Sequence, residues 1–493
     1  MAEKHGSLSI NSENIFPIIK KWLYSDHDIF FRELISNGCD AITKLKKLDM
    51  MGEYTLPEDY KGKIEVIVNP EEKTLKFIDN GIGMTADEVE EYINQIAFSG
   101  ATDFIEKYKD KTNEDQIIGH FGLGFYSAFM VADRVTIDTL SYKEGAQPVH
   151  WECDGGTEYD MTEGTRKEVG TEIVLYLNED SLEFAKEYRA REVISKYCSF
   201  MPVEIFLFTA EQWDKYQEEL ATETVETVEE EKPAEAEEKA EGEDSGTKED
   251  EKAEEKKEEY HPERVSISDT HPLWTKRPGD CTDEEYKEFY RKVFMDFKEP
   301  LFWIHLNMDY PFNLKGILYF PKINTEYDSI EGTIKLYNNR VFIADNIKEV
   351  IPEYLLLLKG VIDCPDLPLN VSRSALQNDG FVKKVRDYIT KKVADKLNGM
   401  FKTDRENYEK YWDDIHPFIK FGCLKDEKFY EKMSGSLLFK NLEGKYLPLS
   451  EINEQEDKDI AYVTDEVQQS QYIKMYKDAG MDAIYLTHNI DSP

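Results

Sequence analysis

The chain has 493 residues, of which 40% are apolar and 33% charged, and this length suits about three domains. Acidic residues outnumber basic ones by 101 to 61, which gives a formal net charge of −40. That balance argues against a protein that coats DNA or RNA, because such proteins need a basic surface, although it does not exclude a nucleotide site built from backbone N–H groups.

No targeting or membrane segment is evident in the sequence. The longest aliphatic run is Leu355–Leu358, which is too short to cross a membrane, and the N-terminus lacks the apolar core of a signal peptide. Six cysteines lack CxxC spacing, so we expect neither a disulfide framework nor a zinc site. They are Cys39, Cys153, Cys198, Cys281, Cys364 and Cys423. We therefore expect the protein in the reducing cytoplasm.

The first half of the chain mixes helix-like and strand-like segments. Apolar spacing predicts helices at 15–23, Ile29–Leu48, Ala86–Ala97 and Ser181–Tyr197. Predicted strands are Lys63–Val68, Thr74–Ile78, Arg134–Thr139, Thr171–Leu177 and Val203–Phe208. Because these segments do not alternate as regular βαβ units, we expect an α+β sandwich with helices over a twisted sheet.

An acidic segment, Gln217–Glu259, follows the first half. It holds 20 acidic and six basic residues and no aromatic residue. Burial of so few apolar groups cannot offset the entropy of ordering, so we predict a disordered linker over 217–262. Its Glu, Lys and Ala content also allows a fluctuating helix. The linker would separate a domain at 1–216 from one at 263–493.

The second half is predicted to begin with strands and continue with longer helices. The predicted strands are Leu301–Met308, Phe312–Phe320 and Lys335–Ile343, with a strand-like run at Ala483–Leu486. The predicted helices are Phe381–Met400 and Glu466–Ala479. We find no internal repeat that relates the two halves.

Two motifs of the first half carry polar side chains. Glu33 and Asn37 are four residues apart, so on one helix they face the same way and could activate a water and hold a metal ion that bears phosphate. Alternatively, Glu33 and Asn37 could simply belong to a polar, solvent-exposed face of the helix, without a role in function. Asp79–Met84, with the sequence DNGIGM, follows a predicted strand, and Asp79 could accept a hydrogen bond from an exocyclic amine. An ordinary hairpin turn would also explain this sequence motif.

Two glycine motifs complete the set. Gly119-His120-Phe121-Gly122-Leu123-Gly124-Phe125 runs into an apolar segment that suits a helix, and glycines before a helix make a phosphate nest. The spacing is neither that of a Rossmann fold nor that of a P-loop. Gly170-Thr171 enters a predicted strand, where the hydroxyl could reach a purine edge or could be an ordinary strand residue.

Together, ExxxN, DxGxG, GxxGxG and GT resemble the ATP-binding fold shared by gyrase B, the MutL proteins, sensor histidine kinases and heat shock protein 90. Longer strings are similar to heat shock protein 90, in particular its bacterial HtpG type. They are Phe31–Asn37, Asp79–Met84, Gly122–Ser127, Pro272–Trp274, Lys335–Tyr337, Arg340–Ile343 and Leu367–Gln377. This resemblance covers the chain apart from the acidic linker. It implies an N-terminal α/β sandwich and a middle domain of the ribosomal protein S5 domain 2-like type.

The resemblance implies ATP and Mg²⁺ as cofactors and a role for each matching position. Glu33 would act on the attacking water, Asn37 would ligate Mg²⁺, and Asp79 would read the adenine amino group with support from Thr171. The remaining nucleotide contacts implied in the first half are Gly83, Met84, Gly119, Gly122, Gly124 and Phe125. The segment at about 84–119 would form a lid.

The second half would contribute a catalytic loop at 367–377. Arg373 would reach the γ-phosphate, supported by Asn370 and Gln377, and hydrolysis would then depend on domain closure. Alternatively, Arg373 could be a surface arginine at the start of a helix, without a role in hydrolysis.

Three features depart from the family pattern. Phe98 stands where the family usually has a lysine, so a phosphate contact from the lid is in doubt. Gly38-Cys39 replaces a more usual small pair, and Gly38 inside a helix should cost about 1 kcal/mol relative to alanine. The resemblance implies that family members continue after Leu486 into a C-terminal dimerisation domain, which we expect this chain to lack. Full-length members would be homodimers, but this departure argues against a stable dimer of this chain.

The function implied by the resemblance is that of an ATP-dependent molecular chaperone that hydrolyses ATP, closes as a clamp and assists the folding of client proteins. Client proteins and co-chaperones would be its partners, with no role for nucleic acid or membrane. A non-hydrolysing holdase gated by ATP is the alternative. A sensor kinase is disfavoured, because only His5 and His27 precede Glu33 and leave no room for a dimerising helical hairpin.

Overall fold

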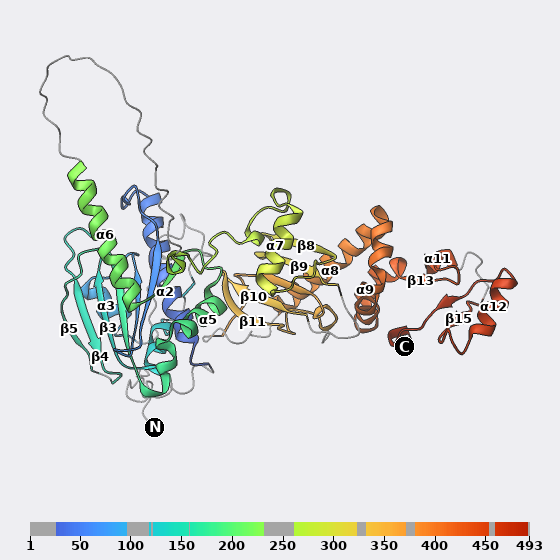
Figure 1. Cartoon of the computed structure of the whole chain (residues 1–493), viewed down its shortest axis with the longest axis horizontal. Coiled ribbons are helices and arrows are strands. Elements are labelled where there is room, and N and C mark those ends of the chain that lie inside the picture. The colour runs from blue at the N-terminus through green and yellow to red at the C-terminus, as the bar shows by residue number, and fades with distance from the viewer. Residues whose placement is uncertain are drawn as a thin grey trace, which may run out of the picture. The chain divides into compact units, whose positions relative to one another are not determined.

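The protein forms two compact units, Met1–Thr270 and His271–Pro493, each described here by itself. The computed structural model (Figure 1) describes residues 26–95, 118–119, 122–156, 158–230, 261–322, 332–370, 380–452 and 459–491. The helix predicted at 15–23 lies outside these ranges.

The first unit contains a seven-stranded sheet in the order β5-β4-β3-β6-β2-β1-β7. The strands are β1 (Lys63–Asn69), β2 (Thr74–Asp79), β3 (Ala132–Leu140), β4 (Val149–Cys153), β5 (Asp160–Glu163), β6 (Gly170–Leu177) and β7 (Glu204–Thr209). Neighbouring strands are antiparallel except for β1 and β7, which are parallel. All five predicted strands of this half are confirmed, whereas the sequence analysis missed β4 and β5.

Helices pack on this sheet. They are α2 (Ile29–Met50), α3 (Ala86–Tyr92), α5 (Glu187–Cys198) and α6 (Ala210–Glu230), with the 3-10 helices η2 (Gly124–Met130), η3 (Glu179–Ala185) and η4 (Pro262–Arg264). Phe30 and Phe31 of α2 are fully buried against Phe77 of β2 and Phe184 of η3. This aromatic cluster fixes α2 over the sheet. The single helix predicted at 181–197 is wrong, because Lys186 adopts an extended backbone between η3 and α5.

The acidic segment does not begin as a disordered linker. Helix α6 continues to Glu230, so the prediction of disorder is wrong for 217–230. Trp213 and Tyr216 both pack on Phe208 with ring centroids 5.3 Å apart, which anchors the start of the helix, and Glu, Lys and Ala favour its continuation. Residues 231–260 lie outside the described ranges.

After this segment the chain returns to the first unit. The backbone N–H of Ile267 donates to the carbonyl of Ile205 at 2.8 Å, and Ser268 Oγ donates to the carbonyl of Val203 at 2.6 Å. Residues 266–269 therefore line the outer edge of the sheet beside β7. For this reason the boundary between the units falls after Thr270 rather than at 263, where we expected the second domain to begin.

The second unit contains a five-stranded sheet in the order β11-β10-β12-β9-β8. Its strands are β8 (Phe302–Met308), β9 (Leu314–Phe320), β10 (Ile334–Asn338), β11 (Val341–Asp345) and β12 (Lys359–Asp363). The helices are α7 (Asp283–Phe294), α8 (Gly380–Thr403), α9 (Arg405–Lys425), α10 (Glu427–Met433), α11 (Leu449–Ile452) and α12 (Ser470–Asp478). Short strands β13 (Leu438–Lys440), β14 (Tyr446–Pro448), β15 (Tyr462–Val463) and β16 (Ile484–Tyr485) form two small sheets. One core joins β8, β9, β10 and β12 to α8, α9 and α10.

The prediction of one strand at Lys335–Ile343 is wrong. Asn339 and Arg340 have φ values of 50° and 64°, and the chain reverses there to form the β10–β11 hairpin. Positive φ at both central residues is typical of a type I′ turn, whose twist matches that of the strands, and asparagine favours it.

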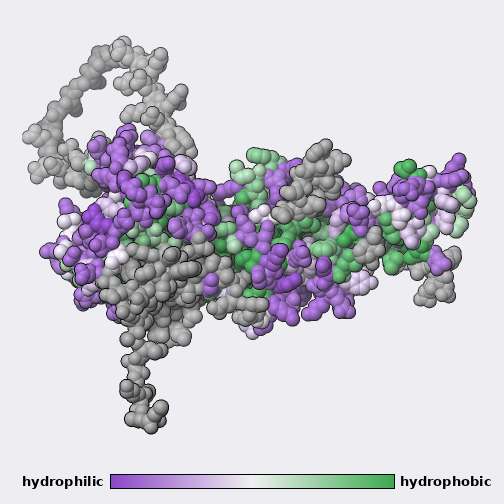
Figure 2. Space-filling view, turned by 90° about the horizontal axis from the view of Figure 1, so that it is seen from below, coloured by the Kyte–Doolittle hydropathy of each residue, from purple (hydrophilic) through white to green (hydrophobic). Residues whose placement is uncertain are grey.

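The surface agrees with the charged composition. In the view of Figure 2, hydrophilic residues cover most of the described surface of the first unit, and hydrophobic residues are more frequent over the second. Within the described ranges, no helix combines the length and the apolar character needed to cross a bilayer. All six cysteines are free thiols.

Candidate nucleotide site

Helix α2 brings three polar side chains to one face because they are spaced by about one or two turns. Glu33, Asn37 and Asp40 follow each other at intervals of four and three residues, and the predicted shared face is confirmed. Glu33 is only 6% exposed, whereas Asn37 is exposed. The buried Arg32 donates to Glu33 Oε1 from Nε at 3.0 Å and from Nη2 at 2.7 Å. This ion pair orients the Glu33 carboxylate.

The glycine-rich segment lies against this face of α2. The backbone N–H groups of Ile118 and Gly119 each donate to the Asp40 carboxylate at 2.7 Å. A Cβ at Gly119 would lie 3.6 Å from Asn37 Oδ1, and one at Gly124 would lie 2.6 Å from Glu33 Oε2. The structure therefore brings Glu33 and Asn37 together with two of the glycines predicted to bind phosphate, and a side chain at Gly124 would displace the Glu33 carboxylate.

The end of the glycine-rich segment differs from the sequence expectation. The helix that follows is the seven-residue 3-10 helix η2, in which Phe125 is buried. The Phe125 ring packs on Tyr126, Phe129 and Trp151 at centroid distances of 5.6, 6.0 and 5.9 Å. Phe125 can thus offer a phosphate only its backbone N–H group. Gly122, with φ of +63°, has the left-handed backbone that glycine permits.

The DNGIGM motif forms a turn that lies between α2 and β3. Asp79 ends β2, and its Oδ1 accepts the Gly81 backbone N–H at 2.9 Å. A Cβ at Gly83, where φ is +61°, would lie 1.9 Å from the Leu140 carbonyl oxygen. A Cβ at Gly38 of α2 would lie 3.3 Å from Asp79 Cβ. Glycines on both sides therefore let the backbone close around Asp79, and the turn leads to α3 rather than to a hairpin strand.

Asp79 belongs to a row of side chains across three strands. It lies opposite Thr171 on β6, and Thr171 lies opposite Thr139 on β3. Residues directly opposite each other in antiparallel strands share one face of the sheet. The two threonine hydroxyl oxygens are 3.0 Å apart, and the Met84 N–H donates to Thr139 Oγ1 at 3.0 Å. The predicted pair Asp79 and Thr171 is thus adjacent in the structure.

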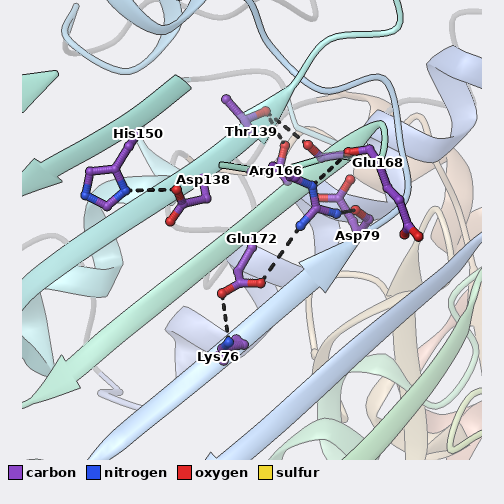
Figure 3. Close-up of polar contacts among 10 residues, drawn as sticks. Lys76, Asp79, Asp138, Thr139, His150, Arg166, Glu168 and Glu172 are labelled. Atoms are coloured by element: carbon purple, nitrogen blue, oxygen red, sulfur yellow. Dashed lines mark hydrogen bonds and ion pairs between the residues drawn. The ribbon is translucent and has the colours of Figure 1, made fainter. Parts of the chain in front are cut away.

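The surroundings of Asp79 make it an unusual carboxyl group. Burial raises its pKa to about 7, while the Gly81 N–H group and the positive charge of Arg166 act in the opposite direction. Arg166 Nη2 also donates to the Asp79 backbone carbonyl at 3.4 Å, and its Nε donates to the Glu168 carbonyl at 3.1 Å (Figure 3). A bound donor, such as an exocyclic amine, would favour the ionised form of this carboxyl group.

Sequence reasoning missed three residues of this site. Asp40 holds the glycine-rich segment and could have been found, because it shares the helix face of Glu33 and Asn37. No sequence pattern indicated Thr139 or Arg166. The register of β3 against β6 brings Thr139 near Asp79, and the loop between β5 and β6 brings Arg166 there. Local patterns in the sequence do not contain that information.

Several predicted residues cannot be placed in this site. Arg373, Gln377 and Phe98 lie outside the described residues, as does most of the predicted lid at 84–119, of which α3 is described. Asn370 is half-buried in the second unit, beyond the end of β12.

The side-chain oxygen of Asn37 suits a hard metal ion whose other ligands are mainly phosphate and water oxygens. The described ranges contain no group of three or more His, Cys, Asp or Glu side chains arranged to bind a metal. Mg²⁺ often takes only one or two protein oxygens and completes its shell with phosphate and water. The exposed Asn37 amide, near Gly119, fits that mode.

Comparisons with known proteins agree with this geometry. Residues 30–158 match the family "Histidine kinase-, DNA gyrase B-, and HSP90-like ATPase", and residues 183–493 match the family "Hsp90 protein". The fold of the first unit is therefore that of the predicted ATPase class.

Individual relatives extend the similarity over nearly the whole chain. The chain is 44% identical to "Chaperone protein htpG" of Bacteroides fragilis (strain YCH46), over 99% of its own length and 66% of the relative's. It is 43% identical to "Chaperone protein HtpG" of Porphyromonas gingivalis (strain W83), with the same coverage. Identity to the protein of the same name from Vibrio atlanticus is 34%, over 95% of this chain and 70% of the relative. The chain thus spans 66% of the length of the first two relatives. It belongs to the heat shock protein 90 family.

Proposed function

We propose that this chain is the nucleotide-binding and middle part of an ATP-dependent molecular chaperone. It binds ATP with Mg²⁺ in the first unit and hydrolyses it, and the resulting conformational cycle assists the folding of client proteins in the cytoplasm. Family membership and the names of the relatives support the chaperone role. The ATPase-class fold of residues 30–158 supports nucleotide binding.

The observation that carries the proposal is that a half-buried carboxyl group, Asp79, and the glycine-rich segment both lie against α2. Asp79 lies at the end of β2, in close contact with Gly38 of α2, where it can accept a hydrogen bond from an adenine amine. Gly119 and Gly124 lie against Asn37 and Glu33 of the same helix. A nucleotide that spans these two places would put its base at Asp79 and its phosphates near Glu33.

The residues of the first unit then have distinct tasks. Glu33, oriented by Arg32, accepts a proton from the attacking water or holds that water in line. The Asn37 amide oxygen would ligate Mg²⁺, which when bound supplies charge neutralisation for the phosphates. Gly122 and Phe125 would bind phosphate oxygens through their backbone N–H groups, whereas the Gly119 N–H donates to Asp40 and so holds the glycine-rich segment beside Asn37.

The second unit is proposed to supply Arg373 as a γ-phosphate ligand, supported by Asn370 and Gln377. This part rests on the resemblance of Leu367–Gln377 to the family's catalytic loop. An arginine that arrives with domain closure would make hydrolysis depend on that closure. The alternative is a holdase that binds ATP without hydrolysing it, and single-turnover phosphate release distinguishes the two.

Calorimetric titration of the chain with ATP and Mg²⁺ tests the binding site. Asp79→Asn should abolish binding, because the amide replaces a carboxylate acceptor with a group that also carries donors. Asp138→Asn is the matched control. Asp138 lies next to Thr139 on β3 and so faces the other side of the sheet, where it pairs with His150 at 2.9 Å (Figure 3). If Asp79→Asn binds ATP with the parent affinity, the proposed base site is wrong.

A further inference from the structure

Thr139 lies at the centre of a small hydrogen-bond network beside the proposed base site. Its side chain, labelled in Figure 3, is fully buried. Its Oγ1 has three polar neighbours. The backbone N–H of Met84 is at 3.0 Å, the carbonyl oxygen of Gly170 at 3.1 Å and Thr171 Oγ1 at 3.0 Å. No role in nucleotide recognition follows from the motifs for this residue.

Counting protons determines the direction of each hydrogen bond. A hydroxyl has one proton to donate and two lone pairs that accept. The Met84 N–H can only donate to Thr139, and the Gly170 carbonyl can only accept from it. The Thr139 proton therefore goes to Gly170, and its second lone pair is left to accept the proton of Thr171.

We propose that Thr139 fixes the direction of the Thr171 hydroxyl, so that Thr171 offers a bound base only an acceptor. The neighbouring ionised Asp79 carboxylate is also an acceptor. This part of the site then requires a donor on the ligand, as in a purine with a 6-amino group, and disfavours a purine with a 6-oxo group. Thr139 is thus a specificity-determining residue that acts through Thr171, and the inference rests on the proposed nucleotide-binding function.

Discrimination of this kind arises because a wrong ligand leaves buried polar groups unpaired or facing like groups. A site built to pair with a donor rejects an analogue that lacks it more strongly than an apolar pocket rejects a change in size. Near pH 8, where most Asp79 carboxyl groups are ionised, a 6-oxo purine would place its oxygen toward two acceptors, with no proton available between them. If Thr171 were free to rotate, its proton could turn toward that oxygen and relieve part of the penalty.

The test compares ATP with inosine triphosphate, which carries a 6-oxo group, by calorimetry on the full chain at pH 8, where Asp79 is mostly ionised. The parent should bind ATP more tightly. Thr139→Val removes the hydroxyl with little change of shape, and the ratio of the two dissociation constants should fall by about fivefold, as expected for one neutral hydrogen bond. A purely structural defect would weaken both ligands equally and leave the ratio unchanged, which would overturn the inference.

Further variants serve as controls for this result. Thr139→Ser keeps the hydroxyl and should keep the parent ratio. Thr136→Val changes a buried threonine three residues earlier on β3, whose side chain faces the other side of the sheet, and should also keep it. In a chain with Thr171→Val, adding Thr139→Val should not change the ratio further. If Thr139→Val does not fold, Thr139→Ala removes the same hydroxyl and takes its place.

The outcomes separate this inference from the proposed function. A parent chain that binds both nucleotides equally, or neither, contradicts the adenine site itself. A parent that prefers ATP, together with a Thr139→Val variant that keeps the full preference, contradicts only the role of Thr139.

Discussion

Asp79 and Thr171 lie directly opposite each other on the antiparallel strands β2 and β6, on the side of the sheet that Gly38 of α2 approaches. A Cβ at Gly38 would lie 3.3 Å from Asp79 Cβ, so the helix shields one side of this half-buried residue from water. This shielding explains why burial is the largest cause of the raised pKa of Asp79.

The first prediction concerns the pH dependence of ATP binding. Burial raises the pKa of Asp79 from 3.8 to about 7, so the acceptor form is complete only above that pH. ATP affinity should be highest near pH 8 and should fall as the pH drops through 7, approaching tenfold per unit because each bound ligand then displaces a proton. Calorimetry between pH 6 and 8 measures this, and an affinity that rises toward pH 6 would have the wrong sign.

A charge substitution should shift this pH profile. The positive charge of Arg166 lowers the pKa of Asp79, so Arg166→Ala should move the midpoint of the affinity profile to higher pH. Arg134→Ala is the control, because Arg134 is a partly exposed arginine of β3 that pairs with Glu152 at 3.4 Å. The same midpoint for Arg166→Ala and Arg134→Ala would exclude the proposed electrostatic effect.

The same pKa predicts the sign of a stability effect. Between about pH 4 and 7 the folded protein keeps the Asp79 proton that the unfolded chain has lost, so this group lowers the free energy of unfolding as the pH rises. Above pH 7 Asp79 is ionised in the folded protein as well, and its unfavourable contribution to the free energy of unfolding no longer changes with pH. Asp79→Asn should therefore raise the melting temperature of the ligand-free first unit at pH 8 and have little effect near pH 4. Calorimetric scans at the two pH values check this.

Substitution by alanine should have different effects on stability at two helical glycines. A Cβ at Gly399 of α8 meets nothing within 4 Å, so Gly399→Ala should stabilise the second unit by about 0.8 kcal/mol through helix propensity alone. A Cβ at Gly38 would lie 3.0 Å from Ile64 Cδ1, so Gly38→Ala should lose that gain to crowding and should weaken ATP binding by displacing Asp79. Denaturant unfolding and calorimetry measure the two effects. A Gly38→Ala variant with a full stability gain and parent ATP affinity would contradict the close packing.

The segment that follows the acidic run should contribute to the stability of the first unit. Ser268→Ala removes the buried hydrogen bond to the Val203 carbonyl and should cost about 1 kcal/mol, or roughly 3 °C in the melting temperature of a unit of this size. Deleting residues 238–252 within the acidic run should leave the melting temperature unchanged. A drop of several degrees on that deletion would show that the run itself packs.

Local patterns in the sequence predicted what depends on local geometry. The shared face of Glu33 and Asn37 follows from helix periodicity, and the end of β2 at Asp79 follows from the glycines after an apolar strand. The network of Thr139 and Arg166 could not be predicted, because it depends on the register between strands that are far apart in the sequence.

Two other errors have equally physical causes. Composition predicted disorder after Tyr216, but a few aromatic contacts to Phe208 were enough to start a helix that acidic residues then continued. Apolar residues on both sides of Asn339 predicted one strand, although an asparagine that adopts positive φ reversed the chain.

The most direct test of the whole account is single-turnover ATP hydrolysis by Glu33→Ala, measured beside its ATP affinity. Glu33 is proposed to act on water and not to hold the base, so hydrolysis should be abolished while the affinity stays within about tenfold of the parent, or roughly 1.4 kcal/mol. Glu33→Gln, which keeps an oxygen for Arg32, should behave in the same way and controls for the loss of that contact. A Glu33→Ala chain that hydrolyses bound ATP at the parent rate would contradict the account.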